Sequence, residues 1–322
     1  SADELAAFAR ATYQDFRSHP RGTSRISVTN PSFKTKGRMA GEVTVIELVN
    51  DNMPFLVDSV MAELHDSKLT VHLVLHPIYN VERGAQGELV SFSGHKGGAA
   101  REDHQESVIH IHVSRIVNEE ARAGLEQRLT RIMDDVRAAV ADWKAMRKRL
   151  TKAVNTYKTA QADGSNNELW EAIQFLEWMA DDNFIFLGMR EYTFDGGAGE
   201  GELTPIDSTG LGLLADPDMR VLRRGGEFVQ ITPEIREFLM RPDPLIIAKA
   251  NVKSRVHRRV YMDYVGTKMF DAAGKMTGEL RIVGLFASTA YNEPTGTIPF
   301  LRRKVSSVLA KAGFDSDSHS GR

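Results

Sequence analysis

The sequence predicts an α+β protein made of two ferredoxin-like units, each with an antiparallel sheet, joined by a long helix. Strand and helix periods alternate over residues 43–76, strands and helices return over 166–315, and a charged helical pattern from about 125 to 160 separates them. The predicted organisation is an N-terminal helix and extended segment (1–34), a first domain (35–150), a linker (151–165), a second domain (166–315) and a tail (316–322).

The first unit opens with a buried strand over residues 43–49, a run rich in β-branched residues. Asp51 and Asn52 can then form a turn and cap a helix, and Pro54 suits a first helical position because its φ is already helical. Apolar residues recur at helical spacing over residues 55–64. One stripe of this helix is therefore expected to pack on the sheet.

Further strands complete the first unit. A period of two returns over residues 69–79, short strands are expected at 89–92 and 107–115, and a helix follows from Ala121 to Trp143. The order strand, helix, strand, strand, strand, helix is that of a ferredoxin-like sandwich. Since both helices then cover one face of the sheet, the other face meets solvent, another domain or another subunit.

The second unit begins with a helix that Asn166 or Asn167 can cap, followed by a strand over residues 184–192. A glycine cluster, Gly196 to Gly201, opens a loop or an insertion that contains little periodicity. Three further strands and a final helix are expected at 245–250, 259–270, 278–288 and 298–312.

Composition excludes several classes of protein. The 322 residues carry a formal net charge of −2, which gives no global attraction to nucleic acid or to an anionic membrane. The absence of cysteine excludes disulfides and thiolate metal sites and fits a reducing compartment. No apolar run approaches the roughly 20 residues that span a bilayer. We therefore expect a cytoplasmic protein with neither nucleic-acid nor membrane partners.

No catalytic signature is present. The glycines between Gly197 and Gly201 have the wrong spacing for a dinucleotide loop, and Thr204-Pro205 follows where a helix is required. Neither a phosphate loop nor a His-Glu-x-x-His motif occurs. The sequence gives no catalytic residue.

Three groups of residues are candidates for binding. Asp51, Asn52 and Met53 lie at the junction of the first strand and first helix, where outward backbone N–H groups can hold the α-carboxylate of an amino acid. The alternative is simple helix capping.

Arg255, Arg258 and Arg259 form a basic run before a strand that contains tyrosines, and guanidinium forks suit a carboxylate or phosphate. The alternative, which we favour, is a solvated edge.

Histidines form the third group. His72 and His76 lie on the outward face of one predicted strand and His110 and His112 on that of another, where zinc could bind. The second and fourth strands of a ferredoxin-like sheet usually lie at opposite edges, which separates the two pairs unless a second subunit joins them. We therefore favour polar residues on a half-buried sheet face over a metal-binding protein.

Several segments resemble the N-terminal region of the large bacterial NAD-specific glutamate dehydrogenases, in the order of that family. They are Asp51-Asn-Met-Pro-Phe-Leu-Val-Asp-Ser-Val60, Thr70-Val-His-Leu-Val-Leu-His-Pro77, Phe175-Leu-Glu-Trp-Met-Ala-Asp-Asp-Asn-Phe-Ile-Phe-Leu-Gly188, Val256-His-Arg-Arg-Val-Tyr-Met-Asp-Tyr-Val-Gly266 and Ile298-Pro-Phe-Leu-Arg-Arg-Lys-Val305. The resemblance covers most of the chain. It implies ACT-like regulatory domains, with the Rossmann fold, the catalytic lysine and the glutamate site far downstream.

What the resemblance implies is a regulatory segment of an enzyme that deaminates glutamate to 2-oxoglutarate and ammonia with NAD. The isolated chain is expected to hold no cofactor and to be inactive. Its expected partners are an amino-acid effector, the downstream catalytic region and further copies in a homo-oligomer. The alternative is a purely structural oligomerisation module that binds no small molecule.

Overall fold

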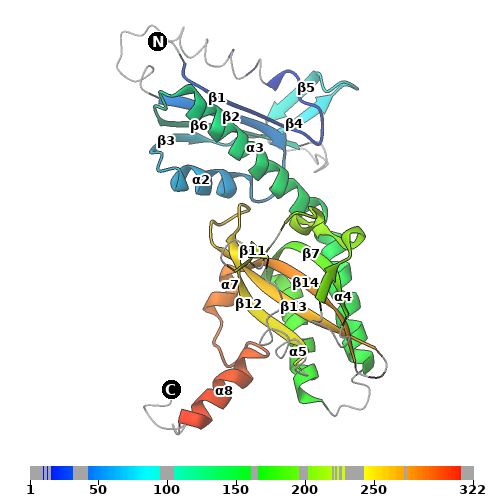
Figure 1. Ribbon diagram of the computed structural model, residues 1–322. Coiled ribbons are helices and arrows are strands. Elements are labelled where there is room, and N and C mark those ends of the chain that lie inside the picture. The colour runs from blue at the N-terminus through cyan, green and yellow to red at the C-terminus, as the bar shows by residue number, and fades with distance from the viewer. Residues whose placement is uncertain are drawn as a thin grey trace. The chain divides into compact units, whose positions relative to one another are not determined.

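In the computed structural model, the chain forms two compact units, Ser1–Arg137 with Arg255–Arg259, and Ala138–Ser254 with Val260–Arg322 (Figure 1). The structure describes residues 10, 13, 16–31, 43–94, 105–160, 166–195, 202–219, 221, 223–224, 227–228, 243–271, 273 and 275–312. Both units contain an antiparallel sheet and helices, which confirms the predicted α+β class.

The first unit holds a sheet of order β1-β2-β6-β4-β5, in which β3 also pairs with β6. Its strands are β1 (Ser24–Thr29), β2 (Val43–Asp51), β3 (Val71–Leu75), β4 (Ile78–Arg83), β5 (Leu89–Gly94) and β6 (Gln105–Ser114). Its helices are α2 (Leu56–Asp66) and α3 (Glu119–Ala141). Arg128 of α3 donates to Glu63 of α2 at 2.6 Å, so the two helices are neighbours.

The two faces of the first sheet differ. Val49 of β2 and Val108 of β6 pack with Phe16 and Val81 in a small apolar cluster. Because side chains alternate along a strand, the residues two and four positions from these valines share their face. Glu47 lies across from His110 there, and Val45 across from His112. This face, called here the histidine face, therefore has an apolar end and a polar end.

Two details of the first unit differ from the sequence prediction. The segment before residue 35 contributes β1, which pairs with β2 along its whole length. The helix expected to begin at Pro54 begins at Leu56, after Phe55 with a φ of 72° and without a side-chain cap. Asp51 and Asn52 do not cap it, because their side chains bond to other parts of the unit.

The second unit holds a sheet of order β12-β13-β14-β7-β8, with β9 also paired to β7. Its longer strands are β7 (Phe184–Asp195), β8 (Glu202–Pro205), β12 (Leu245–Lys253), β13 (Tyr261–Phe270) and β14 (Met276–Phe286). Its helices are α4 (Trp143–Ala160), α5 (Asn167–Trp178), α7 (Ser288–Asn292) and α8 (Leu301–Ala312). Short elements are η2 (Met179–Asn183), η3 (Asp207–Thr209), β9 (Leu211–Gly212), η4 (Leu213–Ala215), β10 (Arg223–Arg224) and β11 (Glu227–Phe228).

An apolar core lies between the helices α4 and α5 and one face of this sheet. Leu150 of α4 and Ile173 of α5 belong to the same buried cluster as Leu280 and Ile282 of β14. Asn166 caps α5 as predicted, since its side chain accepts from the backbone N–H groups of Glu168 and Leu169. Hydrophobic burial on this face is the main stabilising term of the unit.

The long connecting helix is interrupted at Asp142, because α3 ends at Ala141 and α4 begins at Trp143. At this interruption, Asp142 Oδ2 accepts a hydrogen bond from the backbone N–H of Gly212 at 2.7 Å. The helix α4 continues to Ala160, so most of the predicted linker is helical and buries Val154 and Tyr157. The predicted glycine cluster (196–201) and tail (316–322) lie outside the described residues. In the part that the structure describes, no helix is long and apolar enough to cross a membrane.

Candidate functional site

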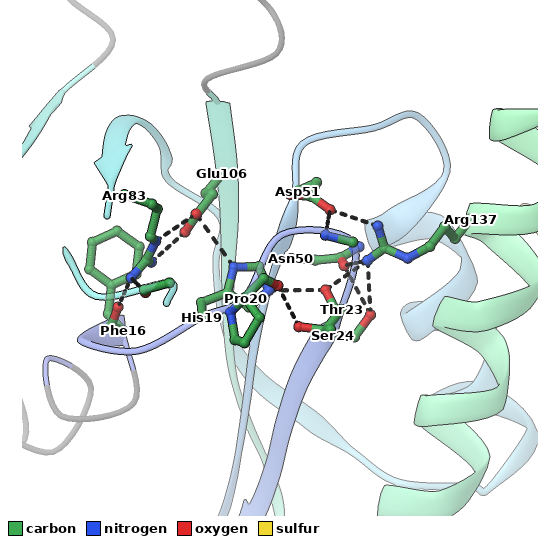
Figure 2. A network of polar contacts seen from close by, with 12 residues as sticks. Phe16, His19, Pro20, Thr23, Ser24, Asn50, Asp51, Arg83, Glu106 and Arg137 are labelled. Carbon is green, nitrogen blue, oxygen red and sulfur yellow. Dashed lines mark hydrogen bonds and ion pairs between the residues drawn. The ribbon is translucent and has the colours of Figure 1, made fainter. Parts of the chain in front are cut away.

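Asp51, the first residue of the predicted effector site, ends β2 beside the turn that precedes β1. Its Oδ2 atom accepts from the backbone N–H of Gly22 at 3.0 Å and from Arg137 Nη1 at 2.6 Å (Figure 2). Gly22 has a φ of 75°, a conformation that favours glycine. The carboxylate is therefore held by a tight turn on one side and by a cation of α3 on the other.

Arg137 joins three parts of the unit at this point. It also donates to the Thr23 carbonyl at 2.7 Å, to Ser24 Oγ at 3.4 Å and to Asn50 Oδ1. The side chain thus connects α3 to the start of β1 and the end of β2. We call Asp51, Asn50, Arg137 and the turn at Gly22 the Asp51 corner.

Asn52 and Met53 follow the corner but take part differently. The backbone N–H of Asn52 donates to the Gln105 carbonyl at 2.9 Å, and its Nδ2 donates to Gln105 Oε1 at 3.2 Å. Asn52 therefore extends the pairing of β2 with β6, and both its backbone N–H and its Nδ2 donate to Gln105. Met53 is half-buried. Of the three predicted residues, Asp51 is the one placed beside a cation.

Figure 2 also shows a second polar network, around Glu106 of β6. Arg83 donates to both oxygens of Glu106, from Nε at 2.8 Å and from Nη2 at 2.6 Å. Its Nη1 donates to the carbonyls of Phe16 and Gly87. Both charged side chains are almost entirely buried. This forked geometry is the strong form of an ion pair.

His19 completes this network and is fully buried. Its Nε2 is 2.9 Å from the Thr23 carbonyl, and because a carbonyl only accepts, Nε2 carries the proton. Its Nδ1 lies 3.4 Å from Glu106 Oε1. Burial raises the pKa of Glu106, but the hydrogen bonds and charge of Arg83, together with the nearby His19, outweigh this effect, so the pKa lies below its usual range.

The structure brings together histidines that the sequence prediction kept apart. The strand β3 pairs directly with β6, which places Leu73 across from His112 and Leu75 across from His110. The expectation of opposite edges was wrong, because β6 is the central neighbour of both β2 and β3. His72 lies in the same segment of β3, whereas His76 lies beyond it and is 2.7 Å from Ser107 Oγ.

Chemically, the histidine face forms a chain of polar contacts. His110 Nδ1 is 3.1 Å from Glu47 Oε1, and its Nε2 is 2.9 Å from Nε2 of His112. Burial lowers the pKa of His112, the charge of His110 lowers it further, and Glu47 opposes them. Among the described residues, no three side chains of the metal-binding types are grouped to hold an ion.

The basic run is occupied by carboxylates of the first unit. Arg255 Nε donates to Asp135 Oδ2 at 2.6 Å, and Arg259 binds both Glu63 and Asp66 of α2. His257, between them, is 2.9 Å from an oxygen of Asp58. Arg258 also has an interaction partner. The carboxylates that meet this run are therefore the chain's own.

Two family models match parts of the chain. A family model described as the ACT1 domain of glutamate dehydrogenase matches residues 1–129, and one described as its helical motif 1 matches residues 298–322. A protein named NAD-specific glutamate dehydrogenase from Pseudomonas aeruginosa is 32% identical over 304 residues, 94% of this chain and 18% of its own length.

Two further relatives carry the same name. The protein from Halomonas elongata is 33% identical over 303 residues, and that from Mycobacterium tuberculosis is 26% identical over 285 residues. The chain belongs to the NAD-specific glutamate dehydrogenase family. It spans less than a fifth of the length of these relatives, covering 18% of the first two and 16% of the third.

Within the glutamate dehydrogenase family match, the ACT1 domain contains Asp51, His19, Arg83 and Glu106. Arg137 follows that domain but completes its corner. Sequence reasoning missed Arg137, Arg83 and Glu106, and no local pattern could have found them. Each is a single charged side chain whose partner is distant in sequence. Arg137 and Asp51, for example, are 86 residues apart.

Proposed function

We propose that this chain is a regulatory, non-catalytic segment of an NAD-dependent glutamate dehydrogenase and that an amino-acid effector binds at the Asp51 corner. The parent reaction is then the oxidative deamination of glutamate to 2-oxoglutarate and ammonia. The match to the ACT1 domain and the relatives' shared name support the parent assignment. The cofactor NAD belongs to the parent protein in this proposal.

The observation that carries the effector proposal is a partly exposed pair of opposite charges. The side chains of Asp51 and Arg137 are 33% and 24% exposed. Both described hydrogen bonds to Asp51 reach Oδ2, so Oδ1 is the oxygen to which an effector's ammonium group can donate. The Nη atoms of Arg137 already donate within the corner, and its Nε, which makes no described hydrogen bond, is the nitrogen that can donate to the effector's carboxylate.

Asn50 adds a further donor to the corner. It is buried, and within the described structure its Nδ2 has no hydrogen-bond partner. Buried donors are rarely left without a partner, because the lost hydrogen bond to water is not recovered. An effector that binds one arrangement of the corner more tightly than another shifts the population toward it, which is the physical basis of regulation here.

Isothermal titration of the chain against the common amino acids tests this proposal. An amino acid that binds wild type should lose its measurable heat in the Asp51→Ala, Asn52→Ala double variant. Asp134→Ala is the matched control, since it removes an exposed acid from the neighbouring helix α3. Unchanged affinity in a folded double variant would discard the site and leave the parent assignment intact.

A second candidate function, an assembly module without a ligand, rests on the strand β3. Among the described strands it pairs with β6 alone, and it exposes Leu73, Val74 and Leu75, the last at 50%. An edge strand with apolar side chains is a natural surface for another copy. Sedimentation of Leu75→Glu against Val117→Glu, a control at another exposed apolar residue, distinguishes this function: only the first should dissociate an oligomer.

A further inference from the structure

The second sheet carries charged side chains on the face opposite its apolar core. Arg190 of β7 lies directly across from Arg281 of β14, and Lys268 of β13 lies across from Glu279 of β14. Leu280 lies between Glu279 and Arg281 on β14 and belongs to the apolar core, so alternation places these charged residues on the other face. Like charges directly opposite each other destabilise a sheet. Two neighbouring arginines are therefore unfavourable unless anionic groups lie beside both of them.

Arg190 is the deepest of these cations, with 0% of its side chain exposed. Its Nη2 donates to the carbonyls of Leu214 and Asp216, the second at 2.7 Å. Its Nε and Nη1 are buried and have no hydrogen-bond partner among the residues that the structure describes. The carboxylate of Asp207 lies 3.9 Å from Nη1, but that side chain is 70% exposed. A buried guanidinium with two unoccupied nitrogens is costly unless an anion neutralises it.

Arg281 lies beside this group and is partly accessible, with 16% of its side chain exposed. Its guanidinium stacks on the ring of Tyr192 at 3.7 Å, and its Nε donates to Glu279 Oε2 at 3.2 Å. The other oxygen of Glu279 accepts from the Tyr264 hydroxyl. One carboxylate thus serves Arg281 and a tyrosine, and it makes no described contact with Arg190.

The backbone keeps the Arg190 guanidinium in place. A side chain at Gly188 would meet the backbone nitrogen of Leu214 at 2.8 Å, so η4 lies directly over this strand. The carbonyls that Arg190 binds come from the same short segment. The orientation of the two unoccupied nitrogens is therefore fixed before any ligand arrives, which lowers the entropic cost of binding.

We propose that Arg190 and Arg281 form an anion site in the second unit, which binds the carboxylate of a small organic acid or amino acid. The unoccupied nitrogens Nε and Nη1 leave N–H donors of a buried guanidinium open to the oxygens of a carboxylate. Arg281 supplies a second positive charge, and its partly exposed side chain is the part of the site that solvent reaches. Lys268 already has an interaction partner, so the two arginines define the site. The proposal is independent of the Asp51 corner.

Anion-dependent thermal stability of the full chain tests this site. The probes are the sodium salts of succinate, citrate, glutamate and phosphate, each compared with sodium chloride at equal ionic strength. At least one carboxylate should raise the melting temperature in a saturable way, and Arg190→Gln should weaken its apparent Kd by about tenfold or more, as expected for lost charge-assisted hydrogen bonds. Arg149→Gln, an arginine of α4 that binds the Thr209 carbonyl, is the matched control and should keep the wild-type Kd.

The other outcomes are also decisive. If no probe exceeds chloride, or if Arg190→Gln binds as wild type does, the site is rejected; if phosphate alone saturates, the carboxylate assignment is rejected. If Arg190→Gln does not fold, Arg281→Gln replaces it and should show the same loss. The Asp51→Ala, Asn52→Ala variant should retain the response, so that failure of one site is not confused with failure of the other.

Discussion

The two sheets of this chain treat buried charge in different ways. On the histidine face of the first sheet, Arg83 and Glu106 are buried together and bonded through both carboxylate oxygens. On the charged face of the second sheet, Arg190 is buried with two nitrogens that have no partner within the structure. A buried charge whose hydrogen bonds the chain itself completes stabilises a fold, whereas one with nitrogens left unbonded indicates a place for a ligand.

The largest expected effect comes from breaking the compensated pair. Glu106→Ala leaves Arg83 buried without its carboxylate and should cost about 3–5 kcal/mol in the free energy of unfolding. All three tryptophans, Trp143, Trp170 and Trp178, belong to the second unit. Urea unfolding followed by circular dichroism should therefore show an early transition, while tryptophan fluorescence keeps its wild-type midpoint.

The control for this change is Glu82→Ala, which removes an exposed acid from the same strand as Arg83. It should leave both midpoints within about 0.5 kcal/mol of wild type. A similar loss in both variants would show that the forked pair has no special role in the first unit.

A change of intermediate size tests the second unit through its own probe. Gly188→Ala places a Cβ atom 2.8 Å from the backbone nitrogen of Leu214, so η4 has to move. The expected cost is about 1–3 kcal/mol, as for overpacking in a core. Here the tryptophan fluorescence midpoint should fall. An unchanged midpoint would show that η4 can shift freely and that Arg190 is not rigidly held.

The Asp51 corner should show a smaller effect, because its charges are partly exposed. Arg137→Ala removes the bonds to Asp51, Asn50 and the turn at Thr23, and we expect a loss of about 1–2 kcal/mol after allowing for solvent screening. Arg131→Ala, an exposed arginine of the same helix, is the control. If circular dichroism gives the two variants the same urea midpoint, the corner is not a structural connection, and ligand binding becomes its main role.

The smallest effect is a dependence on pH. The pKa of Glu106 is lowered in the folded chain, so its stabilising contribution is present above its ordinary value of 4.5 and is lost as pH falls through the lower folded value. The first unit should therefore lose stability in acid more steeply in wild type than in Glu106→Gln. Urea midpoints measured by circular dichroism between pH 3 and 6 check this, and parallel slopes would contradict it.

Local chemistry explains what could be predicted. The β-branched run over residues 43–49 forms β2, the capping amide of Asn166 starts α5, and the apolar stripe through Leu56, Val60 and Leu64 is buried as expected. The failures occurred where distant residues compete with local preferences. Asp51 does not cap a helix because Arg137 and Gly22 bind its carboxylate.

Taken by itself, the sequence determined the α+β class, the order of most elements and the relationship to the glutamate dehydrogenases, because periodicity and motif order are local properties of a chain. The tertiary structure decided which charges meet. It paired Arg83 with Glu106 and Arg137 with Asp51 and set Arg190 across from Arg281. These pairings depend on strand register and helix placement, which arise from contacts between residues far apart in sequence and leave no periodic signal.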